Sequence, residues 1–379
     1  MTRSMDLARE ACDTFLPGLT ADLSAVPLDV LESHTSPGLE AFRRAGGPGL
    51  LVPAQYSGAG ANALEAVRVA RALGALSPSL AVAATMHNFS VASLVALVGS
   101  ADAGGLEWLL VEGIARDRLL VASGFAEGRA GQGILSAVMT AHRVDGGYRV
   151  TGSKKPCSLS RSMDLLTASV TVPLPDGGSE LGVALIPAAS PGITRHPFWT
   201  SPYLAGAESD ELRLDEVEVP DELMLKPKAE LGGGLDTLQT VAFVWFEMLV
   251  TSAYTGVVGR LVEQALSGGR GSVTDRAALV TGLEAAVALM ENRARAALEG
   301  EVGEDDLAAV LTARFAAQDL LVDTADRAAE LLGGMAYITS ADIGYLLAVS
   351  RALAFHPPSR SSSAQALLDH QAGRPLRLS

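Results

Sequence analysis

The chain has 379 residues, 48% of them hydrophobic, and its 43 acidic side chains outnumber 29 basic ones to give a formal net charge of −14. That length suffices for two or three domains, or one large one, with a sizeable buried core. The acidic excess leaves no basic surface for a phosphate backbone, so nucleic acid is excluded as an expected partner.

Cysteine usage and the start of the chain indicate the compartment. Cys12 and Cys157 lie far apart without metal-ligand spacing, and the six histidines are scattered, so we expect neither disulfides nor a metal site. The first residues lack the apolar core of a secretory signal. Apolar runs such as Leu94–Val98 and Val241–Val250 are interrupted before the roughly 18 residues that a membrane span needs. We therefore expect a cytoplasmic protein without a membrane partner.

The first part of the chain, residues 1–119, is predicted to be a helical domain because it is rich in Ala and Leu at helical spacing. Its clearest helix has an apolar stripe that includes Leu64, Val67 and Leu73. Either Gly74 or Ser77–Pro78 is expected to end this helix.

The middle part, residues 120–228, changes to a strand pattern. The turn residues Asp145–Gly147 before YRVTG predict a β-hairpin. Two runs read as short buried strands and a third alternates apolar and polar residues until a proline stops it. They are Leu165–Val172, Leu181–Pro187 and Glu211–Pro220.

The last part, residues 229–379, returns to helices of bundle length. The predicted helices are Leu238–Leu266, Asp275–Leu298, Glu304–Leu332 and Ser340–Leu353. Because the strands are grouped rather than interleaved with helices, a doubly wound sheet is disfavoured. The fold class is therefore α+β, with a helical domain, a central β-rich domain and a C-terminal four-helix bundle.

The sequence lacks the motifs of several common enzyme classes. No GxGxxG follows a strand, and there is no GxxxxGK[ST], HExxH or GxSxG. Five fragments in order are informative instead: LVPAQYSGAGANALEAVRVARAL, the stretch Leu97–Gly113, the run from Glu127 to Gly133 that continues through Ala141, Tyr148, Gly152 and Lys154, DELRLDEVEVP, and Leu331–Tyr337.

Together these fragments resemble the acyl-CoA dehydrogenase superfamily of flavoproteins over nearly the whole chain. The resemblance implies the three-domain α+β fold above with a β-barrel-like central domain, FAD as cofactor, and a homodimer or homotetramer. It also implies that the turn at Gly333–Gly334 receives the adenosine end of FAD from a neighbouring subunit. Taken alone, that glycine pair indicates a left-handed cap closing a helix rather than a ligand contact.

Further flavin contacts are carried over from the family, position by position. Phe125 and Ala126 correspond to contacts with the flavin ring, and Ser158 to a hydroxyl near flavin N5. The other cofactor-binding candidates implied by the resemblance are Gly131, Gln132, Pro156, Cys157, Arg270, Glu330, Gly333, Gly334, Ser359 and Ser361. From the residues alone, Ser158 reads as an ordinary turn serine.

The chain departs from the family at several of these positions. Pro156 stands where a Trp usually shields the flavin, which opens space on one face of the ring. Gln132 and Gly133 replace a Ser-Asp pair. The stretch that supplies an Arg for the FAD pyrophosphate is shortened, which leaves Arg270, with Arg276 as the fallback.

The catalytic base of the family is also displaced. Removing an α-proton from an acyl thioester needs a well-placed carboxylate, and Pro357 occupies the usual position of that Glu. Glu247 is the one acid in a long apolar run, about 100° of helix rotation from an alternative family position. It reads as a base, a buried partner for an Arg, or the polar edge of a helix. His356 is a second candidate base or hydrogen-bond donor, and equally a loop residue.

These residues predict an FAD-dependent oxidoreductase that acts on an acyl thioester carried on coenzyme A or a carrier protein. An α-proton would go to Glu247 or His356, and hydride to flavin N5. Two alternatives stay open. One is a flavin monooxygenase of the same fold that uses reduced flavin and O2 on an amine or an aromatic ring. The other is a flavin-free or catalytically silent member of the family.

Overall fold

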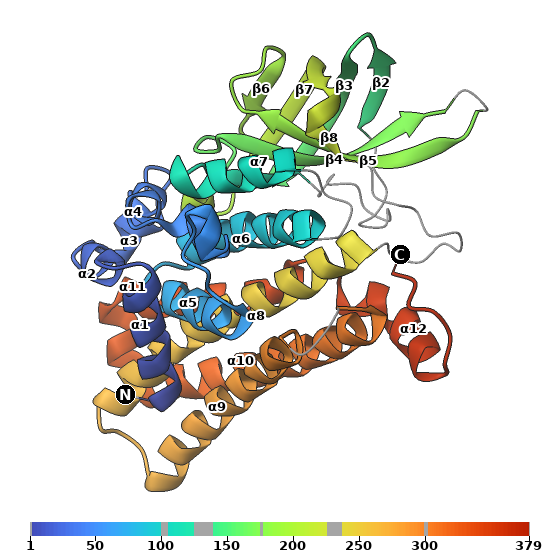
Figure 1. The fold of residues 1–379 in the computed structure, drawn as a ribbon. Helices are drawn as coiled ribbons and strands as arrows, with labels where there is room; N and C mark the ends of the chain where they lie inside the picture. The colour runs from blue at the N-terminus through green and yellow to red at the C-terminus, as the bar shows by residue number, and fades with distance from the viewer. Residues whose placement is uncertain are drawn as a thin grey trace.

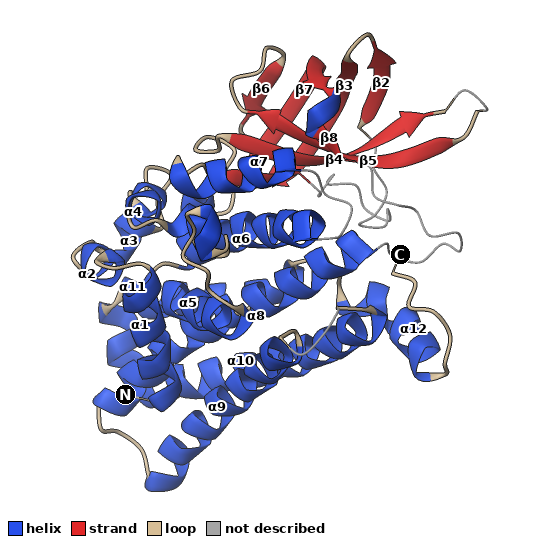
Figure 2. Cartoon of the chain, in the orientation of Figure 1, coloured by secondary structure: helices blue, strands red, loops and turns tan. Residues whose placement is uncertain are grey.

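The computed structural model describes residues 2–99, 105–124, 139–174, 177–225, 237–298 and 302–378. Helices form both ends of the chain, and a sheet formed by the middle of the chain lies at one end of the helical part (Figures 1 and 2). This mixed α+β order is the one predicted. The boundaries proposed between domains stay predictions.

Among the N-terminal helices, α2, α3 and α4 are short. Their bounds are α1 Arg3–Phe15, α2 Leu19–Ser24, α3 Leu28–Leu31, α4 Gly38–Arg44, α5 Ala63–Leu76, α6 Pro78–Gly99 and α7 Gly105–Arg116. Asn62 and Glu65 form a capping box that starts α5: the Asn62 side chain accepts from the Glu65 N–H, and the Glu65 carboxylate accepts from the Asn62 N–H. Of the two endings predicted for this helix, Ser77–Pro78 is the correct one.

Gly74 lies within α5 and does not end this helix; its missing side chain allows a close contact with another helix. A Cβ atom there would lie 1.8 Å from the carbonyl oxygen of Ala253, on the long helix α8 (Thr237–Ser267). One built on Gly256 of α8 would lie 1.9 Å from the carbonyl oxygen of Arg71 on α5. The two glycines therefore let α5 and α8 approach backbone to backbone.

The middle of the chain forms one eight-stranded sheet in the order β6-β7-β3-β2-β4-β5-β8, with β1 paired to β4. The strands are β1 Val121–Gly124, β2 Thr140–Val144, β3 Gly147–Cys157, β4 Leu165–Pro173, β5 Ser179–Pro187, β6 Ile193–His196, β7 Asp210–Pro220 and β8 Met224–Leu225. All three predicted strand runs are confirmed. In the described part of the sheet no ladder joins β6 to β8, so this part is open rather than a closed barrel.

The predicted hairpin is β2–β3. Val144 pairs with Gly147 across a turn formed by Asp145 and Gly146, and Gly146 has a φ of 75°. A positive φ at the second turn residue is where glycine is favoured, which explains the turn signal in the sequence.

The C-terminal part packs α8 against α5, α6, α9 and α10. Its elements are α8 Thr237–Ser267, α9 Val273–Ala296, α10 Glu304–Thr339, α11 Ala341–Val349, the 3-10 turn η5 Ala352–Phe355 and α12 Arg360–Gln371. The predicted end of the third helix is confirmed, because the backbone leaves helical geometry at Gly333, directly after Leu332, and a second helical stretch then runs to Thr339. The fourth predicted helix stops at Val349 instead of Leu353. The last helix, α12, was not predicted.

The sequence analysis expected the apolar runs to be too short to span a membrane, and this expectation needs correction. By length and composition alone, Pro78–Gly99 and Gln239–Ser267 would suffice to cross a membrane. However, 72% and 83% of their most apolar windows are buried within the protein, as in core helices. The polar interruptions noted in the sequence therefore did not shorten these helices; packing against neighbouring elements accounts for their apolar character.

Candidate functional site

Glu247 lies in the middle of α8 with no exposed surface, and its partner is Arg314 on α10, which is equally buried. Nη1 of Arg314 is 3.1 Å from Oε2 of Glu247. Of the three roles that the sequence left open, the contact corresponds to the buried partner of an Arg. A lone carboxylate in an apolar run needs such a partner because burying an uncompensated charge is costly.

Burial raises the pKa of Glu247 to about 7, although the adjacent Arg314 opposes the shift. The carboxylate is therefore held near the balance of its two forms by surroundings that exclude water. Its Oε2 atom makes the ion contact with Arg314 but accepts no well-aligned hydrogen bond from the residues described.

Arg314 also binds the segment after η5. Nη1 donates to the carbonyl oxygen of Pro358 at 2.9 Å. Nη2 donates to the carbonyl oxygens of Leu353, at 2.9 Å, and His356, at 2.6 Å. One guanidinium thus bridges α8, α10 and the chain between η5 and α12.

The ring of His356 faces α8. Its Nε2 lies 2.9 Å from Oη of Tyr254, and its ring centre lies 6.1 Å from that of Phe246 in an edge-on arrangement. Burial, and after it the positive charge of Arg314, lowers the pKa of His356 to about 3. The imidazole is therefore neutral at physiological pH, and it can exchange a hydrogen bond but is a weak base.

This group joins the two predicted catalytic residues. Glu247 and His356 are linked through Arg314, and Phe246 and Tyr254 on α8 flank the imidazole. Phe246 in turn makes an edge-on contact, 5.4 Å between ring centres, with Phe89 on α6. The cluster is thus built on three helices and one loop.

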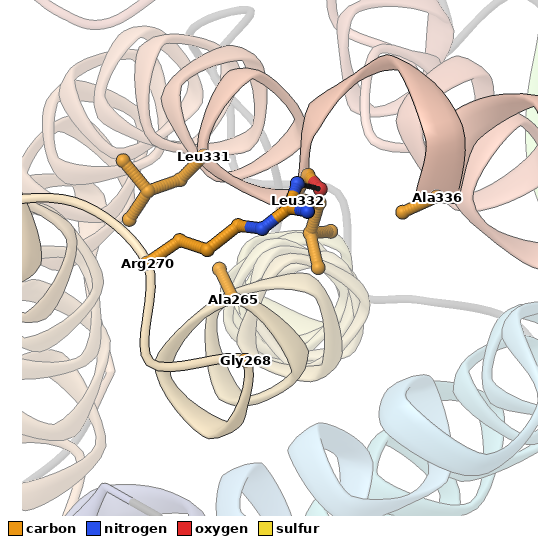
Figure 3. Close-up of a pocket in the computed structure, with 6 residues that line it drawn as sticks. All are labelled: Ala265, Gly268, Arg270, Leu331, Leu332 and Ala336. Carbon is orange, nitrogen blue, oxygen red and sulfur yellow. Dashed lines mark hydrogen bonds between the residues drawn. The ribbon is translucent and has the colours of Figure 1, made fainter.

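A second group surrounds the kink in α10. Arg270, in the loop after α8, donates from Nη1 to the carbonyl oxygen of Leu332 at 2.9 Å. Its side chain extends into a pocket of about 220 Å³ (Figure 3). The pocket is lined by Ala265, Gly268, Arg270, Leu331, Leu332 and Ala336.

Gly333 beside this pocket has φ 82° and ψ 164°, a backbone conformation almost restricted to glycine. A Cβ atom there would lie 2.6 Å from Nη1 of Arg270. A bare backbone next to a guanidinium suits an anionic ligand such as a pyrophosphate, so these residues fit the cofactor end that the resemblance assigns to them. The non-helical backbone of Gly333 ends the first helical stretch of α10, and a second stretch continues to Thr339.

Other predicted cofactor residues lie on β3 and after it. Cys157 ends β3 fully buried, its Sγ donates to the carbonyl oxygen of Ser123 at 3.5 Å, and burial raises its pKa to about 12. Ser158 follows, with its Oγ 2.9 Å from Oγ of Ser209. Pro156 is exposed. The Ser158 hydroxyl is thus held by a neighbouring hydroxyl and is not in an open turn.

The remaining predicted residues are placed as follows. Ser359 caps α12, since its Oγ accepts from the Ser362 N–H at 3.1 Å, and it also contacts Oγ of Ser361 at 3.0 Å. Glu330 is exposed on α10. Gly334 follows the kink. Phe125, Ala126, Gly131 and Gln132 lie outside the described residues, so their roles stay predictions.

The sequence analysis missed Arg314 and Tyr254. The same signal that singled out Glu247 was available for Arg314, which is the one charged residue between Leu307 and Gln318 on a neighbouring apolar helix. Pairing the two lone charges of α8 and α10 would have predicted the contact. Tyr254 lies two turns after Glu247, within the same apolar run.

The family described as acyl-CoA dehydrogenase, N-terminal domain, matches residues 20–103. Isobutylamine N-hydroxylase of Streptomyces viridifaciens is 52% identical over 377 residues, which cover 99% of this chain and 100% of that protein. The chain therefore belongs to the acyl-CoA dehydrogenase superfamily, as the resemblance implied.

Solved structures share the fold at lower identity. KijD3 in complex with FMN and dTDP-3-amino-2,3,6-trideoxy-4-keto-3-methyl-D-glucose has a TM-score of 0.82 at 20% identity, covering 98% of this chain and 94% of that one. A nitrososynthase from Micromonospora carbonacea var. africana has a TM-score of 0.80 at 20% identity, covering 98% and 97%.

Proposed function

We propose that the protein is a flavin-dependent monooxygenase that hydroxylates the nitrogen of a small primary alkylamine. The observation that carries this proposal is the 52% identity, over essentially both full lengths, to a protein named isobutylamine N-hydroxylase. The reaction balances as amine, O2 and reduced flavin giving hydroxylamine, water and oxidised flavin.

The site geometry favours this reaction over thioester dehydrogenation, which was the main prediction from the sequence. Dehydrogenation needs a carboxylate free to take an α-proton. Pro357 occupies the family position, and Glu247 is held 3.1 Å from Arg314 with no exposed surface. Hydroxylation of an amine nitrogen requires no such base.

Flavin is proposed as the cofactor, and the earlier expectation of FAD is widened to either FAD or FMN. If the flavin is FAD, Arg270 and Gly333 would hold its pyrophosphate beside the α10 kink; for either flavin, Ser158 would offer a hydroxyl to the ring. Reduced flavin would supply the two electrons that reduce one atom of O2 to water. The FMN-bound neighbour KijD3, at a TM-score of 0.82, supports a flavin in this fold without distinguishing the two forms.

His356 would act as a neutral hydrogen-bonding group beside the reacting atoms. Its low pKa keeps the imidazole uncharged, and Tyr254 and Phe246 fix the plane of the ring. A neutral donor placed against a developing negative charge on oxygen lowers the barrier without repelling or protonating the amine nucleophile. This assignment also suits an apolar alkyl group packed beside Phe246.

The first prediction tests the reaction. Purified protein supplied with FAD or FMN, a flavin reductase and NADH should convert isobutylamine to N-isobutylhydroxylamine, and ¹⁸O2 should label the product oxygen. Mass spectrometry of the product is the measurement. Boiled protein and a reaction without amine are the controls, since reduced flavin alone consumes O2.

Two outcomes would contradict the proposal. In the first, an acyl thioester bleaches the bound flavin under anaerobic conditions and no labelled hydroxylamine forms under air. This result would support the acyl-thioester dehydrogenase instead. A protein that binds neither flavin at any concentration would instead be a catalytically silent member of the family.

A further inference from the structure

Arg314 makes an unusual set of contacts for a buried arginine. Beside Glu247, it binds three carbonyl oxygens, of Leu353, His356 and Pro358, at 2.6 to 2.9 Å. The first carbonyl lies in η5 and the other two lie in the segment between η5 and α12. No helix or strand includes residues 356–359, so the shape of this segment depends on what binds its carbonyls.

Glu247 balances this arrangement from the other side. A guanidinium with no exposed surface requires a nearby negative charge, because carbonyl oxygens alone do not offset the loss of hydration. The carboxylate on α8 supplies this charge at 3.1 Å and links the segment to the long central helix. We call Arg314, Glu247 and the three carbonyls the Arg314 clamp.

The clamp ends on His356. The carbonyl of this residue takes the shortest of the three bonds, and its ring is held by Tyr254 on the same helix that carries Glu247. Fixing both the backbone and the ring leaves the imidazole little freedom to rotate. Displacing a reacting group by about 1 Å can cost about 100-fold in rate, so such fixation affects turnover.

We propose that Glu247 and Arg314 are positioning residues, which act through the 353–358 segment to aim His356 at the reacting atoms and take no part in proton transfer. The inference rests on the proposed function in that it takes His356 to face the site. It assigns to Glu247 a role different from the base expected from the sequence, and it gives Arg314 a role for the first time.

Two conservative variants separate the roles. In Glu247→Gln the amide oxygen can still accept from Arg314, so we expect kcat to fall less than about tenfold. In Arg314→Lys the charge stays but the planar fork is lost, and one ammonium cannot reach all three carbonyls. We expect this variant to lower kcat by about 10- to 100-fold with KM for the amine nearly unchanged.

The second readout does not need the flavin or the reaction. Hydrogen–deuterium exchange of the amides of residues 353–356 should be much faster in Arg314→Lys and slightly faster in Glu247→Gln, where the hydrogen bond stays but the charge is lost. The matched control is Glu291→Gln on α9, which weakens another buried ion pair, with Arg68 and Arg71. This control should lower stability without changing exchange in the segment or kcat.

The titration of His356 provides a third readout, by NMR of the histidine ring. The charged or titratable groups described around this ring are Tyr254 on α8, Arg314 on α10 and, behind the arginine, Glu247. Because Arg314 lowers the pKa of His356, replacing it by Gln should raise that pKa towards its ordinary value. Arg314→Lys is the control that keeps the charge, so it should leave the pKa of His356 low, and circular dichroism verifies the fold of both variants.

The proposal is overturned if Glu247→Gln abolishes turnover while segment exchange stays normal, because Glu247 would then act in the chemistry. It is also overturned if Arg314→Lys leaves exchange and kcat unchanged. An enzyme without N-hydroxylase activity but with faster exchange in Arg314→Lys would instead remove the proposed function and keep the clamp.

Discussion

The imidazole of His87 lies fully buried between α6 and the first strand of the sheet. Its Nε2 is 3.0 Å from the carbonyl oxygen of Pro48, and its Nδ1 accepts from the Val121 N–H at 2.9 Å. With one nitrogen donating and the other accepting, the ring is neutral. Burial lowers the pKa of His87 to about 4, and only the unfolded chain is protonated between that value and about 6.5.

Acid should therefore destabilise the fold through His87. Since the unfolded chain binds more protons over this interval, the free energy of unfolding rises with pH, and it falls as the pH drops from 6.5 towards 4. A shift of this size corresponds to about 3 kcal/mol. In His87→Gln the amide can keep both hydrogen bonds, so this variant should lose about 3 kcal/mol less over the same interval.

Urea unfolding at several pH values measures this difference. The matched control is His142→Gln on the exposed side of β2, where the same replacement removes no buried ring. Parallel pH dependence in wild type and His87→Gln would show that His87 does not contribute to acid sensitivity.

For individual residues, the sequence identified Glu247 and His356 as candidates for the site but did not identify the side chains that contact them. Glu247 was recognised because a single acid in an apolar run must be compensated, yet the compensating Arg314 lies 67 positions away on another helix. Spacing along the chain carries no information on such a contact. The neutral state of His356 likewise follows from its burial and from Arg314, neither of which is a local property of the sequence around it.

Among the elements, α10 shows how one residue sets the path of a helix. Gly333 bends α10 at φ 82° and ψ 164°, and Arg270 from the loop after α8 occupies the space that a side chain would need. In Gly333→Ala the new Cβ must displace that guanidinium. We expect a loss of about 1 to 3 kcal/mol in stability from the strained backbone.

Ligand binding should distinguish the site from a merely structural kink. If Arg270 and Gly333 hold the pyrophosphate of FAD, Gly333→Ala should weaken FAD binding about tenfold while FMN binding changes little. Gly46→Ala is the matched control because Gly46 has a similar φ of 86°, nothing lies within 4 Å of its added Cβ, and it is not a cofactor-binding candidate. Flavin fluorescence titration measures both affinities, and equal losses for the two cofactors would contradict a pyrophosphate site.

Elements were predicted well where local signals mark both ends. The capping box at Asn62 and the Ser77–Pro78 stop bracket α5, and Asp145–Gly146 sets the β2–β3 turn. The end of the first helical stretch of α10 was predicted because a glycine pair often ends a helix, but the stretch that follows Gly333 was not predicted. The start of α12 was missed because its cap, Ser359, lies in a serine run that looks like a loop.

For the whole molecule, the order of helices, sheet and helices was predicted from composition and pattern alone. The strand runs are grouped in the middle of the sequence, and this grouping excludes a sheet in which strands alternate with helices. Strand order was not visible. β3 lies between β7 and β2, and β1 pairs with β4 in parallel, through contacts between residues far apart in the chain. Such pairings depend on tertiary packing of both faces, which a single sequence does not specify.

The surface beyond the α10 kink carries exposed apolar side chains. Three exposed apolar side chains lie there, beside the pocket that contains Arg270: Met335, Tyr337 and Ile338, which are 66%, 55% and 77% exposed. Neighbouring exposed apolar side chains of this size usually mark an interface. We propose that a second copy covers them in a homodimer or homotetramer, so that each α10 turn lies against its neighbour's cofactor.

Ile338→Asp should therefore give monomers with weakened FAD binding, because a buried carboxylate at the interface would lack a partner. Light scattering after size exclusion measures the mass, and flavin fluorescence measures the binding. Leu109→Asp on α7 is the control, since it adds the same charge at a side chain that is 62% exposed elsewhere in the fold. Wild-type protein that elutes as a monomer with FAD bound would exclude a shared cofactor site, and an equal effect of both substitutions would show that charge alone is responsible.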